Sequence, residues 1–272
     1  MRGALWIVLF VTGTYAALCL FAFLFQKRLT FFPERELVAT PDDVGLPFET
    51  LRIPTPDGES LHAWFVPHPT SRAVVLFFHG NAGNMSQRLE TLRFWHDLGL
   101  SVLVFDYRGY GHSSGRVSEA GTQMDARSVW RYLTETRTYA SESVVLFGRS
   151  LGAAVAIELA AQVGCAGLVA ESAFTSLVDM AQHAYPWLPV RLLVRMRFDS
   201  RRRVAAVRAP KLFIHSTEDE LVPTTMGRAL YEAAPDPKRF LAIRGAHNDG
   251  WLRSGDVYRD GVQAFVQALG LP

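Results

Sequence analysis

A serine flanked by glycines is the most informative short pattern in the chain. The pentapeptide Gly148-Arg149-Ser150-Leu151-Gly152 follows the apolar run Val144–Phe147 and precedes a small-residue stretch that begins at Ala153. A strand-to-helix turn tight enough to lift a serine hydroxyl above a sheet crowds the flanking backbone, so glycines two positions before and after it remove clashing Cβ atoms. Such a pentapeptide often arises by chance, but its place between a buried strand and a small-residue helix favours a nucleophile. We predict that Ser150 attacks an acyl carbonyl.

A serine nucleophile needs a base, and the chain order in this strand–turn–helix arrangement is serine, acid, histidine. Five of the eight histidines precede Ser150, His183 lies in a long insertion, and His215 falls in or at the end of a predicted strand. His247 follows the last predicted strand, on a loop from which an imidazole can reach over the sheet. We therefore assign His247 as the general base, with an ordinary surface-loop histidine as the alternative.

The acid of a triad should lie between the serine and the histidine, just past the end of a strand. Asp219 fits this position because it lies in the turn that follows the apolar run Leu212–His215. Its carboxylate would fix the imidazole tautomer and stabilise the imidazolium. Glu218 and Glu220 are neighbouring alternatives, and Asp199 is less favoured because it lies within an arginine-rich segment.

An oxyanion intermediate needs two hydrogen-bond donors. The backbone N–H of Leu151 lies at the start of a predicted helix, where partial positive charge accumulates. The glycine-containing stretch His79–Asn84 follows the run Ala73–Phe78, and Asn81 is the candidate for the second donor. A phosphate-binding loop is the alternative, but neither phosphate-loop spacing of glycines is present. The sequence has no metal-binding signature, and we expect no metal and no cofactor.

The elements that must position these residues alternate between apolar runs and helical periodicity. Alternating strands and helices imply right-handed crossovers and a mainly parallel sheet. Predicted strands cover residues 48–54, 61–66, 73–78, 100–105, 144–147, 167–170, 212–215 and 240–243, and predicted helices cover 87–98, 120–136 and 151–163.

Composition indicates one large globular domain behind an apolar leader. The chain has 272 residues, of which 49% are hydrophobic and 20% are charged, so intrinsic disorder, a disulfide-stapled miniprotein and a multi-span transporter are excluded. A net charge of +2 argues against nucleic-acid binding. The two cysteines, Cys19 and Cys165, lie in different parts of the chain and are not expected to form a bridge.

The N-terminal segment Ala4–Phe25 carries no charge. As a helix it reaches roughly 33 Å, enough to cross a hydrocarbon layer of about 30 Å. A cleaved signal peptide is the alternative, but its apolar region would be shorter and would end at a small-residue site, whereas this one runs into Phe23–Arg28. We favour an uncleaved single-pass anchor over residues 1–28. The positive charges of its two flanks are nearly equal, so the positive-inside rule favours neither orientation.

The rest of the chain divides into a polar connector over residues 29–46 and a catalytic domain over 47–272, with a helical insertion or cap at 174–208. The insertion contains a basic stretch opposed only by Asp199, which could contact anionic lipid heads or an anionic substrate. We favour a solvated helical face. The arginines of this stretch are Arg191, Arg195, Arg197, Arg201, Arg202, Arg203 and Arg208.

Several longer segments together resemble the α/β-hydrolase superfamily and, within it, the membrane-anchored Bem46-like hydrolases. They span nearly all of residues 45–269 in the order typical of that group. These segments are FFHGNAGN (77–84), VFDYRGYGHSSG (104–115), FGRSLGAAVA (147–156), ESAFTS (171–176), residues 185–189 and 198–200, DELVP (219–223) and GAHND (245–249).

The resemblance implies an α/β-hydrolase fold, with a mostly parallel sheet of about eight strands flanked by helices, behind an N-terminal transmembrane helix. It supports Ser150, Asp219 and His247 as the triad and Asn81 and Leu151 as oxyanion donors. Members of the group are serine hydrolases of acyl esters or thioesters, including lipids and lipidated proteins, and similar sequences are also labelled serine peptidases.

The residues before the candidate acid depart from the pattern of this group. His215-Ser216-Thr217 stands where many relatives have His-Gly-Thr. We expect the change to alter the geometry of the following loop without removing a catalytic group. The sequence thus predicts a membrane-tethered serine hydrolase, with a serine peptidase or a non-catalytic binding module of the same fold as alternatives.

Overall fold

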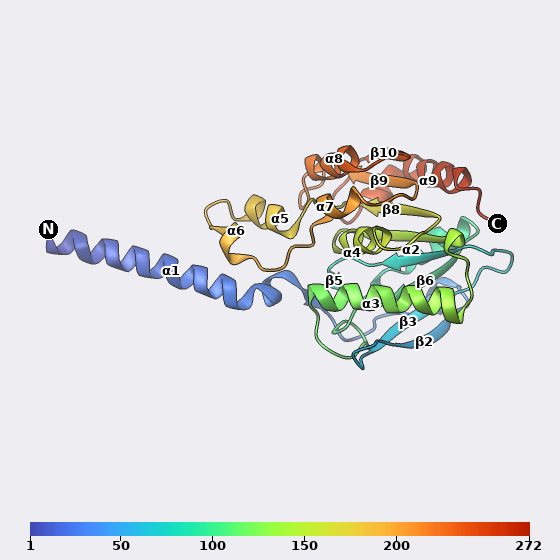
Figure 1. The fold of residues 1–272 in the computed structure, drawn as a ribbon, viewed down its shortest axis with the longest axis horizontal. Helices are drawn as coiled ribbons and strands as arrows, with labels where there is room; N and C mark the ends of the chain where they lie inside the picture. The colour runs from blue at the N-terminus through green and yellow to red at the C-terminus, as the bar shows by residue number, and fades with distance from the viewer.

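The computed structural model describes residues 1–272 as a globular body from which one long helix projects (Figure 1). This helix, α1 (Arg2–Thr30), has no buried residue and is long and apolar enough to cross a membrane. Only the elements α5 and α6 of the body lie beside it in the view of Figure 1.

The body is built on one eight-stranded sheet in the order β10-β9-β8-β7-β4-β6-β3-β2. β2 is antiparallel to β3 and β3 to β6, and all other neighbours are parallel, which confirms the predicted mostly parallel sheet. The strands are β2 (Glu49–Pro54), β3 (Ser60–Val66), β4 (Val74–Phe78), β6 (Ser101–Phe105), β7 (Val144–Arg149), β8 (Gly167–Glu171), β9 (Lys211–Ser216) and β10 (Lys238–Ile243).

Helices cover both faces of this sheet. Apolar side chains of α2 and α9 pack on one face, and those of α3, α4 and α8 pack on the other. Strand β4 is buried on both faces because its alternate residues enter the two cores, as its unbroken apolar sequence predicts. The helices of the body are α2 (Leu89–Asp97), α3 (Glu119–Arg131), α4 (Leu151–Ala160), α5 (Leu177–Ala184), α6 (Val190–Leu193), α7 (Ser200–Val204), α8 (Thr224–Ala233) and α9 (Gly250–Ala268).

The segment that follows α1 is fastened to the body. Its two-residue strand β1 (Phe32–Pro33) pairs in parallel with β5 (Ala82–Gly83). The backbone carbonyl of Glu34 accepts a hydrogen bond from the N–H of Gly111 at 2.8 Å. Helix α1 therefore continues two residues past the boundary predicted at residue 28, and part of the predicted connector is held against the loop after β4.

The insertion between β8 and β9 contains α5, α6 and α7. Its seven arginines between residues 191 and 208 are all exposed. Arg203 forms an ion pair with Glu158 at 2.7 Å. Arg195 stacks on the ring of Phe23 in α1, with its guanidinium carbon 4.2 Å from the ring centroid. At least two of these arginines thus have partners within the chain.

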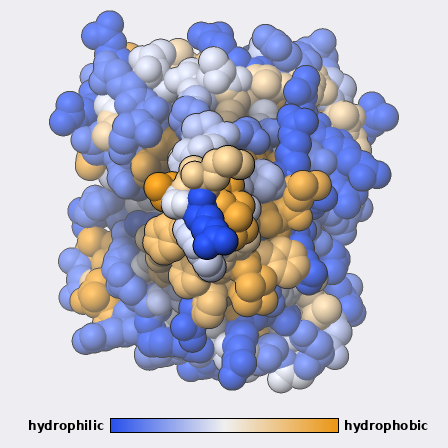
Figure 2. Space-filling model, turned by 90° about the vertical axis from the view of Figure 1, so that its left-hand side faces the viewer, coloured by the Kyte–Doolittle hydropathy of each residue, from blue (hydrophilic) through white to orange (hydrophobic).

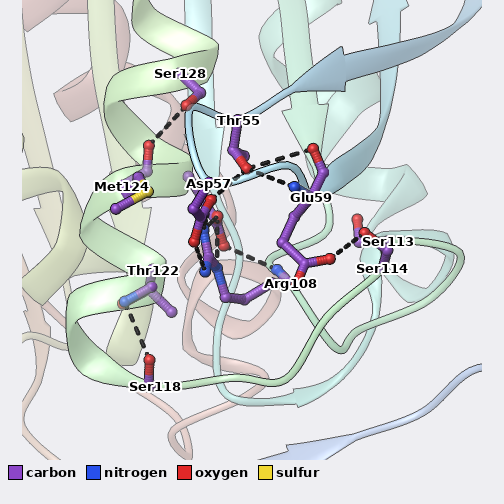
Figure 3. Close-up of polar contacts among 12 residues, drawn as sticks. Thr55, Asp57, Glu59, Arg108, Ser113, Ser114, Ser118, Thr122, Met124 and Ser128 are labelled. Carbon is purple, nitrogen blue, oxygen red and sulfur yellow. Dashed lines mark hydrogen bonds and ion pairs between the residues drawn. The ribbon is translucent and has the colours of Figure 1, made fainter.

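A buried ion-pair network joins the loop after β6 to the β2–β3 hairpin and to α3 (Figure 3). The Arg108 guanidinium lies 2.7 Å from a carboxylate oxygen of Asp57 and 2.8 Å from one of Asp125. The Asp125 side chain is fully buried, and its carboxylate also accepts the backbone N–H of Arg108 at 2.9 Å. Arg108 therefore ties the start of this loop to the hairpin and to α3 through charged hydrogen bonds.

We expect Arg108→Ala to lower the free energy of unfolding by about 3–5 kcal/mol, because it leaves the buried Asp125 carboxylate without its cation. Urea denaturation of the full chain in detergent micelles measures this change. Arg131→Ala is the matched control, since it removes only a solvent-exposed pair with Glu135, and we expect a much smaller change. Equal losses for the two variants would contradict the role given to the network.

Candidate active site

Ser150 occupies a sharp turn between β7 and α4. Its backbone has φ +55° and ψ −119°, a strained conformation for a residue with a side chain. A Cβ atom on Gly148 would lie 2.3 Å from the carbonyl oxygen of Gly152, and one on Gly152 would lie 2.0 Å from that of Phe78. The two glycines are therefore required by close backbone approach, as their spacing indicated.

Asp219 and His247 are joined by a hydrogen bond. Asp219 lies in the loop after β9 and His247 in the loop after β10. The Nδ1 atom of His247 is 2.8 Å from one carboxylate oxygen of Asp219 and 3.0 Å from the other. The Asp219 side chain is fully buried, and that of His247 is nearly so. This contact fixes the orientation of the ring and the tautomer that carries the proton on Nδ1.

The Asp219 carboxylate is held in its ionised form. Burial by itself raises the pKa of this carboxyl, but hydrogen bonds from His247 and from the backbone N–H of Val222 and Leu221 outweigh it and keep the pKa below its ordinary value. The two backbone donors lie 2.8 and 3.0 Å from the carboxylate. A negative charge therefore lies beside the imidazole at neutral pH.

The alternative acids contact other groups. Glu218 accepts the backbone N–H of Gly245 at 3.1 Å, and Glu220 accepts that of His247 at 2.9 Å. Both carboxylates thus hold the backbone of the histidine loop instead of the ring. Asp199 accepts the backbone N–H of Arg202 at the start of α7. Among the four candidates, Asp219 is the one whose carboxylate contacts the imidazole of His247.

A second imidazole lies beneath Asp219. The Nε2 atom of His215 is 2.9 Å from the carbonyl oxygen of Val222 and 3.5 Å from Asp219. Its other face packs against Gly227, where a Cβ atom would lie 2.2 Å from Nδ1. Burial lowers the pKa of His215 and so favours its neutral form. His215 is enclosed below the loop and is not placed to act on a substrate.

Sheet order places Ser150 at the same edge as the Asp219–His247 pair. Strands β7, β8, β9 and β10 are neighbours and all parallel, so the loops after them emerge at one edge. The backbone N–H of Ser150 donates to the carbonyl of Glu171 at the end of β8. No hydrogen bond joins Ser150 to His247 in this structure, and the Nε2 atom of His247 makes none. Catalytic hydrogen bonds are often long before substrate binds.

The candidate oxyanion donors come from two segments that lie close to Ser150. Leu151 is the first residue of α4, so its N–H has no partner within the helix. The loop after β4 also approaches the serine, since a Cβ atom on Gly80 would lie 3.8 Å from that of Ser150. The side chain of Asn81 points elsewhere. Its Nδ2 donates to the carbonyl of Thr30 at 2.5 Å, and its Oδ1 accepts from Tyr110 at 3.0 Å. Asn81 can therefore serve the site only through its backbone N–H.

Buried polar side chains that the sequence analysis did not single out support this loop. His79 is fully buried, and its Nε2 lies 3.4 Å from a carboxylate oxygen of Asp106, which also accepts the N–H of Met85 at 2.8 Å. The rings of Tyr107 and Tyr110 pack on His79. The sequence signal that could have identified His79 and Asp106 is a polar residue directly after a strand that is mostly apolar.

The departure at Ser216 has a structural consequence. The Ser216 hydroxyl donates to the carbonyl of Gly245 and accepts the backbone N–H of Glu218 at 3.1 Å. A glycine could make neither contact. The serine therefore connects the loop of Asp219 with the loop of His247 and leaves their side-chain hydrogen bond intact.

The site chemistry comes from these side chains and backbone groups. No group of three or more His, Cys, Asp or Glu side chains is placed to hold a metal ion. The arrangement offers a ring whose Nδ1 proton is fixed by a carboxylate, a free Nε2, and backbone N–H groups beside a half-buried serine turn. Such a set can transfer a proton and stabilise a developing negative charge.

Known proteins resemble this chain in sequence over most of its length, and solved structures resemble it in fold. The profile of the family described as Serine aminopeptidase, S33 matches residues 69–203. Protein bem46 of Schizosaccharomyces pombe is 33% identical over 90% of this chain and 87% of its own length. The uncharacterized membrane protein YNL320W of Saccharomyces cerevisiae is 34% identical over 87% and 88%. The esterase Pf2001 of Pyrococcus furiosus superposes with a TM-score of 0.74 at 20% identity, covering 88% of this chain and 97% of its own.

Proposed function

Because this chain belongs to the α/β-hydrolase family and is a relative of bem46, we propose that it is a membrane-tethered serine hydrolase that cleaves acyl esters or thioesters. The observation that carries the proposal is the Asp219–His247 hydrogen bond at the sheet edge where the Ser150 turn emerges. A carboxylate that fixes Nδ1 leaves Nε2 free to take a proton from a serine hydroxyl.

In the proposed mechanism, the Ser150 oxygen attacks the acyl carbonyl while Nε2 of His247 takes the hydroxyl proton. The carbonyl oxygen becomes negative and is held by the N–H groups of Leu151 and Asn81. The imidazolium then gives its proton to the leaving alcohol or thiol, and an acyl group remains on Ser150. His247 next takes a proton from water, which attacks the acyl carbon, and the imidazolium then returns this proton to the Ser150 oxygen as the acid is released.

The ionised Asp219 supports both half-reactions. Each one passes through an imidazolium on His247, and the adjacent carboxylate stabilises that positive charge. The backbone donors of Leu221 and Val222 hold the carboxylate in place, so it needs no reorganisation when the charge appears.

The tether supports the choice of acyl substrate. Helix α1 is long and apolar enough to cross a membrane, and a yeast relative is named a membrane protein. A site fixed to a bilayer meets lipids and lipidated proteins at high local concentration. The description of the matching family favours a second candidate, a peptidase, since amides and esters share the same tetrahedral intermediate.

We expect a fluorophosphonate to form one covalent adduct, on the peptide that contains Ser150. Intact mass and peptide mapping of the full chain in micelles measure this, and His247→Ala should slow labelling by about 100-fold or more because the base is lost. Labelling of a different residue, or equal rates in both proteins, would contradict the proposed nucleophile.

Paired substrates distinguish the two candidate activities. We compare kcat/KM for p-nitrophenyl esters of increasing acyl length with that for aminoacyl p-nitroanilides, with Ser150→Ala as the blank. The esterase proposal expects the esters to be preferred. A preference for the anilides would establish the peptidase on the same site.

A further inference from the structure

Polar side chains on the otherwise apolar helix α1 bind the backbone of the insertion. The Tyr15 hydroxyl donates to the carbonyl of Trp187 at 2.8 Å. The Gln26 amide donates to the carbonyl of Leu193 at 3.4 Å and accepts the N–H of Arg195 at 2.8 Å. The tip of the insertion, residues 185–195, is therefore fastened along the C-terminal half of α1, beside which Figure 1 places α5 and α6.

The spacing of these contacts along α1 indicates how deep in a bilayer the tip of the insertion would lie. Gln26 directly precedes the charged residues Lys27 and Arg28, so it marks the end of the apolar span. Tyr15 lies about 16 Å further along the helix axis, near the middle of a hydrocarbon layer about 30 Å thick. If α1 spans a bilayer, the contact with Trp187 places the tip within one leaflet.

The tip has properties suited to the interior of a leaflet, namely hydrogen-bonded backbone groups and large apolar side chains. Non-helical backbone is costly in lipid unless its polar groups are satisfied, and the side chains of Tyr15 and Gln26 satisfy three of them. The exposed side chains of the tip include three large apolar ones, Tyr185, Trp187 and Leu192, and two arginines, Arg191 and Arg195, whose long side chains can extend toward the headgroups. Trp187 is 56% exposed, and Leu192 is 83% exposed. Viewed down α1, apolar side chains gather around the helix and hydrophilic ones form the outer rim (Figure 2).

The same end of α1 reaches the candidate active site. The carbonyl of its last residue, Thr30, accepts a hydrogen bond from Asn81, in the loop whose Gly80 faces Ser150. The pairing of β1 with β5 extends this contact by two residues. A lipid chain beside the base of α1 is therefore close to the proposed oxyanion loop.

We infer that the tip, residues 185–195, is a second membrane-inserted element, which enters the same leaflet as the C-terminal half of α1 and opens the site toward lipid. The partner surface is the acyl-chain region of a bilayer, and the substrate class is an ester or thioester whose acyl chain lies in that leaflet. The substrate part of this inference depends on the proposed hydrolase function, and the insertion of the tip does not.

Insertion is tested with a fluorophore that reports polarity. Leu192→Cys is labelled with nitrobenzoxadiazole in a full chain that also carries Cys19→Ala and Cys165→Ala, and it is reconstituted in phosphatidylcholine–phosphatidylglycerol vesicles. We expect blue-shifted emission and quenching by lipids brominated in their acyl chains. The control is Val257→Cys on α9, an exposed apolar position outside the tip, which should emit as in water. Water-like emission and no quenching at position 192 would overturn the inference.

Access from the leaflet is tested by activity. The double variant Trp187→Asp/Leu192→Asp should lose at least tenfold in turnover of p-nitrophenyl palmitate held in vesicles and stay within twofold on soluble p-nitrophenyl butyrate. Val257→Asp should change neither rate. Equal effects of the double variant on both substrates would overturn lateral access. If the wild type cleaves neither ester, the proposed function fails, while the fluorescence result still decides insertion.

Discussion

Ser150→Ala is expected to lower kcat for p-nitrophenyl butyrate by about 10⁴-fold or more, because the acyl-enzyme route then lacks its nucleophile. Alanine keeps the Cβ atom and the close contacts of the turn, so the fold should be retained. Stopped assays on the full chain in micelles measure the rate, and circular dichroism and thermal unfolding verify the fold.

The matched control is Ser141→Ala. Ser141 lies before the opposite end of the same strand, β7, and makes no side-chain hydrogen bond in this structure. We expect its replacement to leave kcat within about twofold, as for a surface change away from the site. A Ser150→Ala protein that is folded and turns over at the wild-type rate would refute the nucleophile assignment.

Asp219→Asn is expected to lower kcat by roughly 10⁴-fold with little change in KM. An amide can present its NH₂ group to the imidazole and stabilise the tautomer that carries the proton on Nε2, which cannot accept the serine proton. The change also removes the negative charge that stabilises the imidazolium. Steady-state kinetics separates the two constants.

The neighbouring Glu220 provides the control for Asp219. Glu220→Gln keeps an oxygen that can accept the backbone N–H of His247, so we expect a loss within about tenfold from altered positioning. The double variant Ser150→Ala/Asp219→Asn should be no slower than Ser150→Ala, because the two residues act in one step. Similar losses for Asp219→Asn and Glu220→Gln would contradict the assignment of the acid.

The sheet was predictable because its strands carry a strong local signal. Residues 73–78 and 144–147 are unbroken apolar runs, and such runs are buried on both faces of a parallel sheet. The helices over residues 224–233 and 250–268 were not predicted. Both helices mix polar and apolar residues, and apolar side chains on one face of each helix pack on the sheet. These helices are stabilised by packing on the sheet, which the local sequence does not show.

The acid of the candidate site shows where spacing alone is insufficient. Glu218, Asp219 and Glu220 are consecutive, and any of them could follow a strand and precede a turn. Loop geometry separates them, since two backbone N–H groups hold Asp219 in place and its neighbours bind the histidine loop. The sequence favoured Asp219 because of its position in the turn after a strand. The hydrogen bonds of its carboxylate supply a physical reason for choosing it over its neighbours.

The long-range contacts of α1 and of the segment after it could not be predicted from the sequence. The pairing of Phe32 with Ala82 and the hydrogen bond from Asn81 to Thr30 each join residues about 50 positions apart. A two-residue strand has no periodicity, and one polar residue in an apolar helix has no specified partner. The role of the predicted connector therefore appears only in three dimensions, where it joins helix α1 to the loop beside Ser150.

The central claim is that the groups of this site converge on one reacting atom, and the structure of the fluorophosphonate adduct tests it most directly. We predict phosphorus on the Ser150 oxygen, a phosphonyl oxygen about 2.7–3.1 Å from the backbone nitrogens of Leu151 and Asn81, and Nε2 of His247 within about 3.2 Å of the serine oxygen. An adduct at Ser150 with the His247 ring turned away and both backbone donors bound elsewhere would contradict the account.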